Sequence, residues 1–343
     1  MKHFLLKFII LFFLLDGYIA WYALKVYPNL CGEMDNLSQI PFGPEYHSRM
    51  DSIYPITAVF VKNIYADEVS PSFPKAVYTI GDSFSAQDHL GYQQFFGESI
   101  GDTIFNILHH FDISAEDLFC QLINSGLIGQ GSTIIVESVE RNMIKRLCNI
   151  NLAGQLPKDH AKRITEGEGN GKMNILNGAA AKLRMTLGYK NPIISYKTNV
   201  DLFSHSTIHN KLFIFNSKWN SYDYGQDGDL LFQYVEKEDY EKAFRNLYKL
   251  KELADSNNIK FMYLIVGDKY DVYEPFIIDK HPHNPTLDNC PEEPWVINTK
   301  PMLQENARKG VKDIFRINDT HWSPIGAKLV ADYLKIKYDK YIE

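Results

Sequence analysis

The stretch from Ala76 to Ser85, AVYTIGDSFS, combines a short apolar strand pattern with an abrupt stop at Gly81. Its β-branched and aromatic residues predict a buried strand over 76–80, and the glycine predicts a sharp turn directly after it. Ser83 then follows the carboxyl end of that strand, where we expect a helix to begin. Backbone N–H groups at a helix N-terminus can bind an oxyanion, so Ser83 is a candidate nucleophile. Ordinary turns use the same residue types, so Gly-Asp-Ser alone is weak support.

Strand and helix patterns alternate on the C-terminal side of this stretch. Further strands are predicted at Thr103 to Leu108, Thr133 to Glu137, Ile259 to Val266 and Ile314 to Ile317. Helices are predicted after an N-cap at Ser114 and over Tyr240 to Ser256, Lys300 to Arg308 and Ser323 to Tyr338. This order predicts a mainly parallel sheet with helices on both faces, a three-layer α/β/α fold. In such sheets the active groups gather at the carboxyl ends of the strands.

Residues 76–343 form this predicted domain, and residues 27–75 are expected to be a linker and N-terminal extension. The segment from about 156 to 234 fits the alternation less well, and we interpret it as an insertion or cap over the site. Its aromatic side chains, which would either stack on sugar rings or pack within a loop, are Trp219, Tyr222 and Tyr224.

The N-terminus carries an apolar stretch, Phe4 to Leu24, of bilayer-spanning length. Residues 1–26 are therefore predicted to be a signal or an anchor, and the absence of a small-x-small cleavage pattern favours the anchor. Lys2 and Lys7 place the short N-terminal side in the cytoplasm and the rest of the chain outside it. Asp16 opposes this interpretation, because a carboxylate within the span needs a partner or a proton. The alternative is a buried helix of the soluble fold.

Composition excludes two classes of protein. The chain has 343 residues, of which 45% are hydrophobic and 23% charged, which is typical of a globular protein rather than a disordered one. The formal net charge is -6, and no basic stripe is present, so a nucleic-acid partner is not expected.

The cysteines and histidines give no clear metal motif. The four cysteines have no C-x-x-C spacing, so neither a zinc ribbon nor a thioredoxin-type site is predicted, although disulfides remain open. They are Cys31, Cys120, Cys148 and Cys290. His281 and His283 lie near Asp288 and Cys290 and could hold zinc, but the intervening proline favours an exposed loop. We therefore predict neither a metal nor a cofactor.

A second motif near the end of the chain supplies what a nucleophilic serine needs. Asp319-Thr320-His321-Trp322 follows the last predicted strand and precedes the last predicted helix. A serine requires a general base, here His321, and the base requires an acceptor on its other ring nitrogen, here Asp319. Together with Ser83 these residues predict a Ser-His-Asp triad. The alternative for Asp319 is turn and cap chemistry, which is compatible with aiming the histidine.

The Gly-Asp-Ser block and the late Asp-x-His resemble the SGNH hydrolase superfamily. The segment DTHWSPIGAKLVADYL, residues 319–334, is similar to the AlgX/AlgJ-like family of alginate O-acetyltransferases. The segments IIVESVERN (134–142) and VGDKYDVY (266–273) also resemble that family. The resemblance implies an SGNH-type fold and extracytoplasmic transfer of acetyl groups to polysaccharide hydroxyls. It also implies a membrane-bound acyltransferase as the partner that supplies the acetyl group.

The remaining site candidates also lie at predicted strand ends. The Ser83 backbone N–H is the first choice of oxyanion donor. The oxyanion or substrate-binding side chains are Asn106, Arg141, Asp268, Lys269, Tyr270 and Trp322. For Arg141 the alternative is a salt bridge with Glu137 or Glu140, and for residues 268–270 it is an ordinary helix N-terminus.

We therefore predict a polysaccharide O-acetyltransferase that is anchored in the cell membrane, with its catalytic domain in the periplasm. Its acceptor would be an exported or cell-surface polysaccharide. The alternatives are an SGNH-type carbohydrate acetylesterase and a non-catalytic polysaccharide-binding or assembly component.

Overall fold

The structure is a computed structural model. It describes residues 58–66, 75–87, 90–108, 113–156, 235–276, 285–311 and 321–342, the short strands 202–205 and 212–215, and single residues at 18, 54, 69, 314 and 315.

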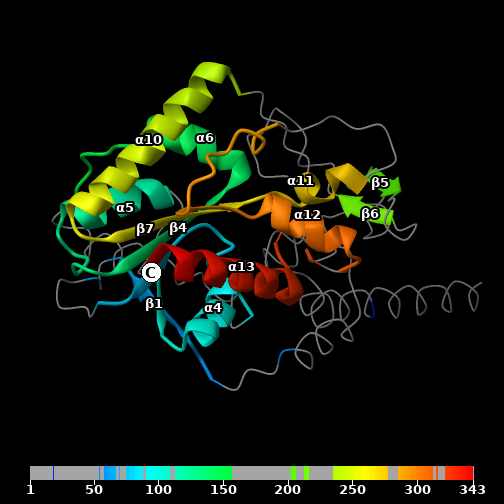
Figure 1. The fold of residues 1–343 in the computed structure, drawn as a ribbon, viewed down its shortest axis with the longest axis horizontal. Helices are drawn as coiled ribbons and strands as arrows, with labels where there is room; N and C mark the ends of the chain where they lie inside the picture. Colours follow the sequence, from blue (N-terminus) through cyan, green and yellow to red (C-terminus); the bar gives the residue numbers. More distant parts are fainter. Residues whose placement is uncertain are drawn as a thin grey trace, which may run out of the picture.

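A six-stranded sheet forms the centre of the fold (Figure 1). All its strand pairs are parallel, in the order β1-β3-β2-β4-β7-β8. The strands are β1 (Val61–Tyr65), β2 (Val77–Ile80), β3 (Ile104–Leu108), β4 (Thr133–Val139), β7 (Lys260–Val266) and β8 (Val296–Asn298). From β2 the chain first adds β3 on one side and then β4 on the other. The carboxyl ends of β2 and β4 therefore flank a topological switch point, where open α/β sheets bind ligands.

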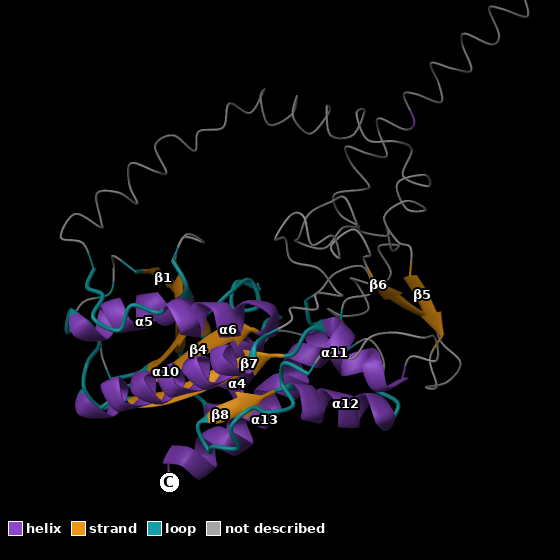
Figure 2. Cartoon of the chain, turned by 90° about the horizontal axis from the view of Figure 1, so that it is seen from above, coloured by secondary structure: helices purple, strands orange, loops and turns teal. Residues whose placement is uncertain are grey.

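Helices cover both faces of the sheet, as Figures 1 and 2 show. The first face carries α5 (Ala115–Asn124), α6 (Glu140–Asn149) and α10 (Lys237–Ser256). The second face carries α4 (Tyr92–Ile100), α12 (Lys300–Arg308) and α13 (Pro324–Ile342). A short helix, α11 (Lys269–Tyr273), and a 3-10 turn, η3 (Glu274–Phe276), follow the carboxyl end of β7. The predicted three-layer α/β/α arrangement with a parallel sheet is confirmed.

Strand β7 shows why the sheet needs both helical layers. Phe261, Tyr263 and Ile265 belong to the core cluster under α5, α6 and α10. Met262 and Leu264 alternate with them and belong to the cluster under α4, α12 and α13. A strand buried on both faces has a continuous apolar sequence.

Most predicted elements are present, with shifted ends. β4 runs two residues beyond the predicted Glu137, to Val139, and α6 starts immediately afterwards. The Ser114 hydroxyl accepts a hydrogen bond from the Asp117 N–H at 3.1 Å, which confirms the predicted N-cap. In place of the predicted strand 314–317, the described residues show a single antiparallel bridge between Phe315 and Trp322.

Two strands of the central sheet were not predicted. β1 lies inside the range expected to be a linker, yet it pairs with β3 and forms one edge of the sheet. β8 pairs with β7 and forms the other edge. In the predicted cap the structure describes one antiparallel pair, β5 (Leu202–His205) and β6 (Leu212–Phe215). The rest of the predicted cap between 157 and 234 lies outside the described residues.

None of the described helices has the length and apolar character required to cross a bilayer. The predicted anchor, Phe4 to Leu24, lies outside the described residues except for Tyr18.

Candidate active site

The structure brings the predicted nucleophile and base together. Ser83 follows β2 and His321 precedes α13, and the Ser83 Oγ lies 2.8 Å from the His321 Nε2 across 238 positions of sequence. The His321 side chain is buried, whereas Ser83 is partly exposed. A hydroxyl within hydrogen-bond reach of an imidazole is the arrangement of an activated serine nucleophile.

The segment that carries Ser83, residues 81–86, is called the nucleophile turn below. Two hydrogen bonds shape it, from the Ser85 N–H to the Asp82 carbonyl at 2.9 Å and from the Ala86 N–H to the Ser83 carbonyl at 3.2 Å. The prediction that Ser83 begins a helix was wrong, because the next helix, α4, starts only at residue 92. The Ser83 backbone N–H forms no hydrogen bond within the described part of the chain, so this N–H stays the first choice of oxyanion donor.

Gly81 is needed here for its small size. A Cβ at this position would lie 2.3 Å from both the Glu137 Oε2 and the Ser85 Oγ. We expected this glycine to permit a sharp turn, but its φ is not positive, so the close approach of neighbouring side chains provides the physical reason.

Asp82 ties the nucleophile turn to the start of α6. Its Oδ2 accepts a hydrogen bond from the Val139 N–H at 3.1 Å and lies 2.5 Å from a guanidinium nitrogen of Arg146. This role of Asp82 was not predicted, although the aspartate stands in the Gly-Asp-Ser motif itself.

Ser85 is held by side chains from three elements. Its hydroxyl donates to the Glu137 Oε2 at 2.9 Å and lies 3.1 Å from the Tyr92 hydroxyl. Its carbonyl accepts hydrogen bonds from the side chains of Gln93 at 2.7 Å and Asn106 at 2.8 Å. Four side chains thus immobilise a residue two positions after the nucleophile.

Asn106 therefore does not act as the predicted oxyanion donor. Its Nδ2 donates both to the Ser85 carbonyl and to the Asn63 Oδ1, and its Oδ1 accepts from Thr79 at 3.0 Å. An amide nitrogen has two hydrogens, and both are used within the fold. The residue supports the nucleophile turn from β3.

Trp322 was predicted to contact the oxyanion or the substrate. Its side chain is fully buried, so the structure shows it as a packing residue instead. Its indole packs edge-on against Phe84 with ring centroids 4.8 Å apart, and it also contacts Tyr92. The Phe84 ring in turn lies 4.6 Å from the His321 ring. Aromatic packing thus holds the base against the nucleophile turn.

The predicted substrate contacts after β4 and β7 are buried as well. Arg141 forms an ion pair with Asp268, and Lys269 and Tyr270 are each less than 5% exposed. Neither predicted alternative partner of Arg141 forms the ion pair; the partner is a carboxylate 127 positions away. These residues join the start of α6 to the start of α11 and present little surface to a ligand.

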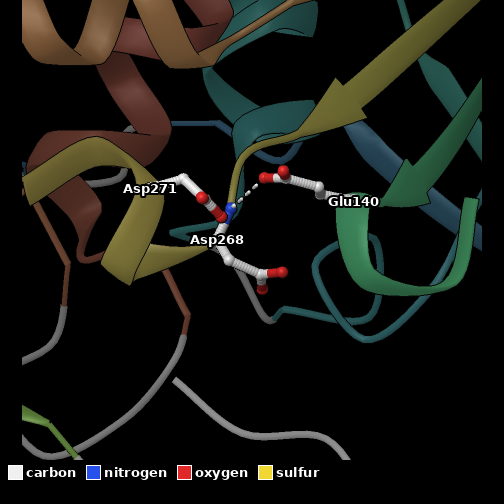
Figure 3. A group of neighbouring side chains, drawn as sticks. All are labelled: Glu140, Asp268 and Asp271. Atoms are coloured by element: carbon white, nitrogen blue, oxygen red, sulfur yellow. Dashed lines mark hydrogen bonds between the residues drawn. The ribbon is translucent and has the colours of Figure 1, made fainter. Parts of the chain in front are cut away.

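Three carboxyl groups gather beside this ion pair: Glu140, Asp268 and Asp271 (Figure 3). The Asp268 N–H donates to the Glu140 Oε2 at 3.3 Å. Burial, and then the carboxylate of Asp271, raise the pKa of Glu140. Carboxylate oxygens suit a hard cation such as Mg²⁺. In the structure, the positive charge beside Asp268 comes from Arg141, and the cluster joins the start of α6 to the start of α11.

Several predictions lie outside the described residues. Asp319, the predicted partner of His321, is one of them, as are His281 and His283, the aromatic residues of the predicted cap and Cys31. Asp288 is described and pairs with Lys300 at 3.3 Å.

A small cavity of about 40 Å³ lies beside the nucleophile turn. Its lining comes from the turn and from the end of β3: Gly81, Asp82, Ser85, Ala86, Asn106, Ile107 and Leu108. Since one water needs roughly 10–15 Å³ by the same measure, there is room for about three heavy atoms.

Comparisons with known proteins add no further assignment. No protein-family model, no curated protein and no solved structure matches this chain.

Proposed function

We propose that this protein is an O-acyltransferase that works through a serine acyl-enzyme and transfers acetyl groups to polysaccharide hydroxyls. The observation that supports the serine chemistry is the 2.8 Å contact between the Ser83 Oγ and the His321 Nε2. The contact lies at the carboxyl ends of the strands, at the switch point of the sheet, where such folds bind ligands.

In the proposed first step, His321 Nε2 accepts the proton of the Ser83 hydroxyl while the Oγ attacks the carbonyl carbon of an acetyl ester. The Ser83 N–H stabilises the oxyanion that forms. The bond to the donor oxygen then breaks, the donor alcohol takes the proton from His321, and the acetyl group remains on Ser83. Asp319 is proposed to orient the imidazole through its other ring nitrogen.

In the second step a sugar hydroxyl loses its proton to His321 and attacks the acetyl carbon. The bond to Ser83 breaks, and the serine oxygen recovers a proton from the imidazole. The product is an acetylated sugar and free enzyme. If water attacks instead, the same residues catalyse ester hydrolysis, so exclusion of water decides between transferase and esterase.

The identity of the transferred group and of its acceptor has no support from the cavity beside the nucleophile turn, because neither Ser83 nor His321 lines it. The acetyl group, the polysaccharide acceptor and the SGNH-type fold are proposed from the sequence motifs. The N-terminal membrane anchor with a periplasmic domain, and a membrane-bound acyltransferase as the donor, are proposed on the same ground.

The test is intact mass spectrometry of the full chain in detergent after exposure to an activated acetyl ester. We expect the parent to gain one acetyl group, and Ser83→Ala and His321→Ala to gain none. Ser99→Ala, which removes another serine hydroxyl on the distant part of α4, serves as the matched control and should behave like the parent.

Added oligosaccharide then separates the alternatives. Transfer of the acetyl group to sugar supports the transferase, and loss to water at the same rate with or without sugar supports an esterase. If the parent is never acetylated and turns over no ester, the acyl-enzyme is refuted and a non-catalytic polysaccharide-binding component becomes the better interpretation.

A further inference from the structure

Glu137 is a fully buried carboxyl group directly under the nucleophile turn. It lies on β4, where its register partner on β7 is the apolar Leu264. Its Oε2 accepts the hydrogen bond from Ser85, and it faces the space that Gly81 leaves open. A buried ionised carboxylate needs a cation and several donors, so the groups around Glu137 determine its charge.

The charged and titratable groups that face Glu137 disfavour its ionisation. Asp82 on the nucleophile turn repels a negative charge, and Tyr92 on α4 is neutral. Arg146 on α6 attracts a negative charge, but it is already paired with Asp82. Burial is the largest influence and, together with Asp82, raises the pKa of Glu137 well above its ordinary value, against the smaller opposing effects of Ser85, Arg146 and the Asp82 backbone N–H.

We propose that Glu137 and Ser85 are positioning residues for the nucleophile: the Glu137 carboxyl holds the Ser85 hydroxyl, and Ser85 fixes the turn that presents Ser83 to His321. This inference rests on the proposed function, because it concerns the same serine. It assigns a role to the second serine of the Gly-Asp-Ser-Phe-Ser stretch and to a carboxyl group that takes no part in the proposed reaction.

Ser85 can transmit this constraint because it is bonded at every polar group. Its N–H bonds to the Asp82 carbonyl, its carbonyl is held by α4 and β3, and its hydroxyl bonds to Glu137. The turn between Asp82 and Ser85 encloses Ser83, so a shift of Ser85 moves the Ser83 Oγ relative to His321. A misplacement of about 1 Å costs a catalytic group roughly 100-fold in rate.

The test uses a fluorophosphonate that reacts with activated serines, with the full chain in detergent. In this reaction the Ser83 Oγ forms a bond to phosphorus, the P–F bond breaks, fluoride leaves, and His321 takes the serine proton. Ser85→Ala is expected to slow labelling by about 10- to 100-fold through the maximal rate, with the apparent affinity for the probe unchanged. Ser99→Ala is the matched control and should leave the rate unchanged.

Glu137→Gln separates a neutral carboxyl from an ionised one, because an amide reproduces the shape and the acceptor of a protonated acid. We expect labelling close to the parent rate in Glu137→Gln and a loss in Glu137→Ala. In the parent the rate should fall as pH rises through the point where Glu137 ionises, and Glu137→Gln should lack that fall. Above the pH at which an ordinary carboxyl ionises, difference infrared spectroscopy should still show a carboxylic-acid carbonyl band in the parent that Glu137→Gln removes, even if Glu137→Ala does not fold.

The outcomes distinguish this inference from the proposed function. If Ser85→Ala labels as fast as the parent, the positioning pair is refuted while the acyl-enzyme stands. If Glu137→Gln is as slow as Ser85→Ala and the infrared band is missing, the neutral state of Glu137 is refuted. If the parent is not labelled, or Ser83→Ala is labelled equally fast, the serine mechanism itself fails and the positioning role fails with it.

Discussion

Substituting Gly81 by alanine is the most direct perturbation of the nucleophile turn. The added Cβ would meet the Glu137 Oε2 and the Ser85 Oγ at 2.3 Å and the Glu137 Cβ at 2.7 Å. Ordinary contacts begin near 3.4 Å, so bringing the 2.7 Å contact with the Glu137 Cβ to that distance requires the turn and β4 to separate by about 0.7 Å. Glu137 cannot relieve the clash by rotation alone, because its own Cβ is among the crowded atoms.

Two effects of different size follow. Overpacking of this kind costs about 1–3 kcal/mol of unfolding free energy. A displacement of about 1 Å between nucleophile and base costs roughly 100-fold in rate, which corresponds to about 2.7 kcal/mol of transition-state stabilisation. Gly81→Ala should therefore stay folded and lose nearly all its reactivity towards a serine-directed probe.

The assay compares labelling rate with stability to denaturant in the same samples. Gly101→Ala is the matched control, because Gly101 ends α4 with a φ of +67° and has no neighbour within 4 Å of an added Cβ. Alanine in this left-handed conformation costs about 1–2 kcal/mol without touching the turn. Gly101→Ala should lose similar stability and keep its labelling rate. Equal rates for Gly81→Ala and the parent would refute the argument that this close approach sets the position of Ser83.

Three further predictions concern charge and capping. Asp82→Asn removes the negative charge beside Glu137, so the pKa of Glu137 should fall. The pH dependence of the infrared carbonyl band of Glu137 measures this change. An unchanged pH dependence would contradict the conclusion that Asp82 raises the pKa of Glu137. Ser114→Ala removes the N-cap of α5 and should cost about 1 kcal/mol in denaturant unfolding with no effect on labelling. The folded state raises the pKa of Glu137, so Glu137 contributes its full stabilisation below the ordinary carboxyl pKa. The unfolding free energy should then decline as the pH rises through the pKa of Glu137 in the folded state. Glu137→Gln should make this decline smaller in denaturant unfolding measured across pH.

The fold was predictable where burial alone dictates the sequence pattern. β7 is covered on both faces, so its residues are uniformly apolar, and α12 has the predicted boundaries because its apolar positions repeat at helical spacing. The edge strands gave no such signal. β1 is mostly exposed, and its polar residues Lys62 and Asn63 are adjacent, so it lacks the alternation of a half-buried strand. β8 has only three residues, too few for any period to emerge.

Of the candidate site, only the two side chains that meet at 2.8 Å were predictable. Ser83 and His321 stand in recognisable local motifs, whereas their supports depend on pairings between distant segments. Asn106 is predicted to be an oxyanion donor because it lies near the end of a predicted strand. In the structure its amide donates a hydrogen bond to the Ser85 carbonyl instead. One signal was available: Glu137 is a carboxyl group within the otherwise apolar or uncharged run TIIVESV, and a buried carboxyl requires a partner.

The contact between Ser83 and His321 is stabilised by the residues adjacent to each of them. Phe84, next to Ser83, packs on the ring of His321, and Trp322, next to His321, packs on Phe84. The bridge from Trp322 to Phe315 and the packing of α13 against α4 fix the segment that carries His321 to the second face of the sheet. Two short motifs far apart in the sequence therefore meet because each includes a large apolar side chain that is buried when they do. This explains why neither motif alone predicts a site, whereas the pair does.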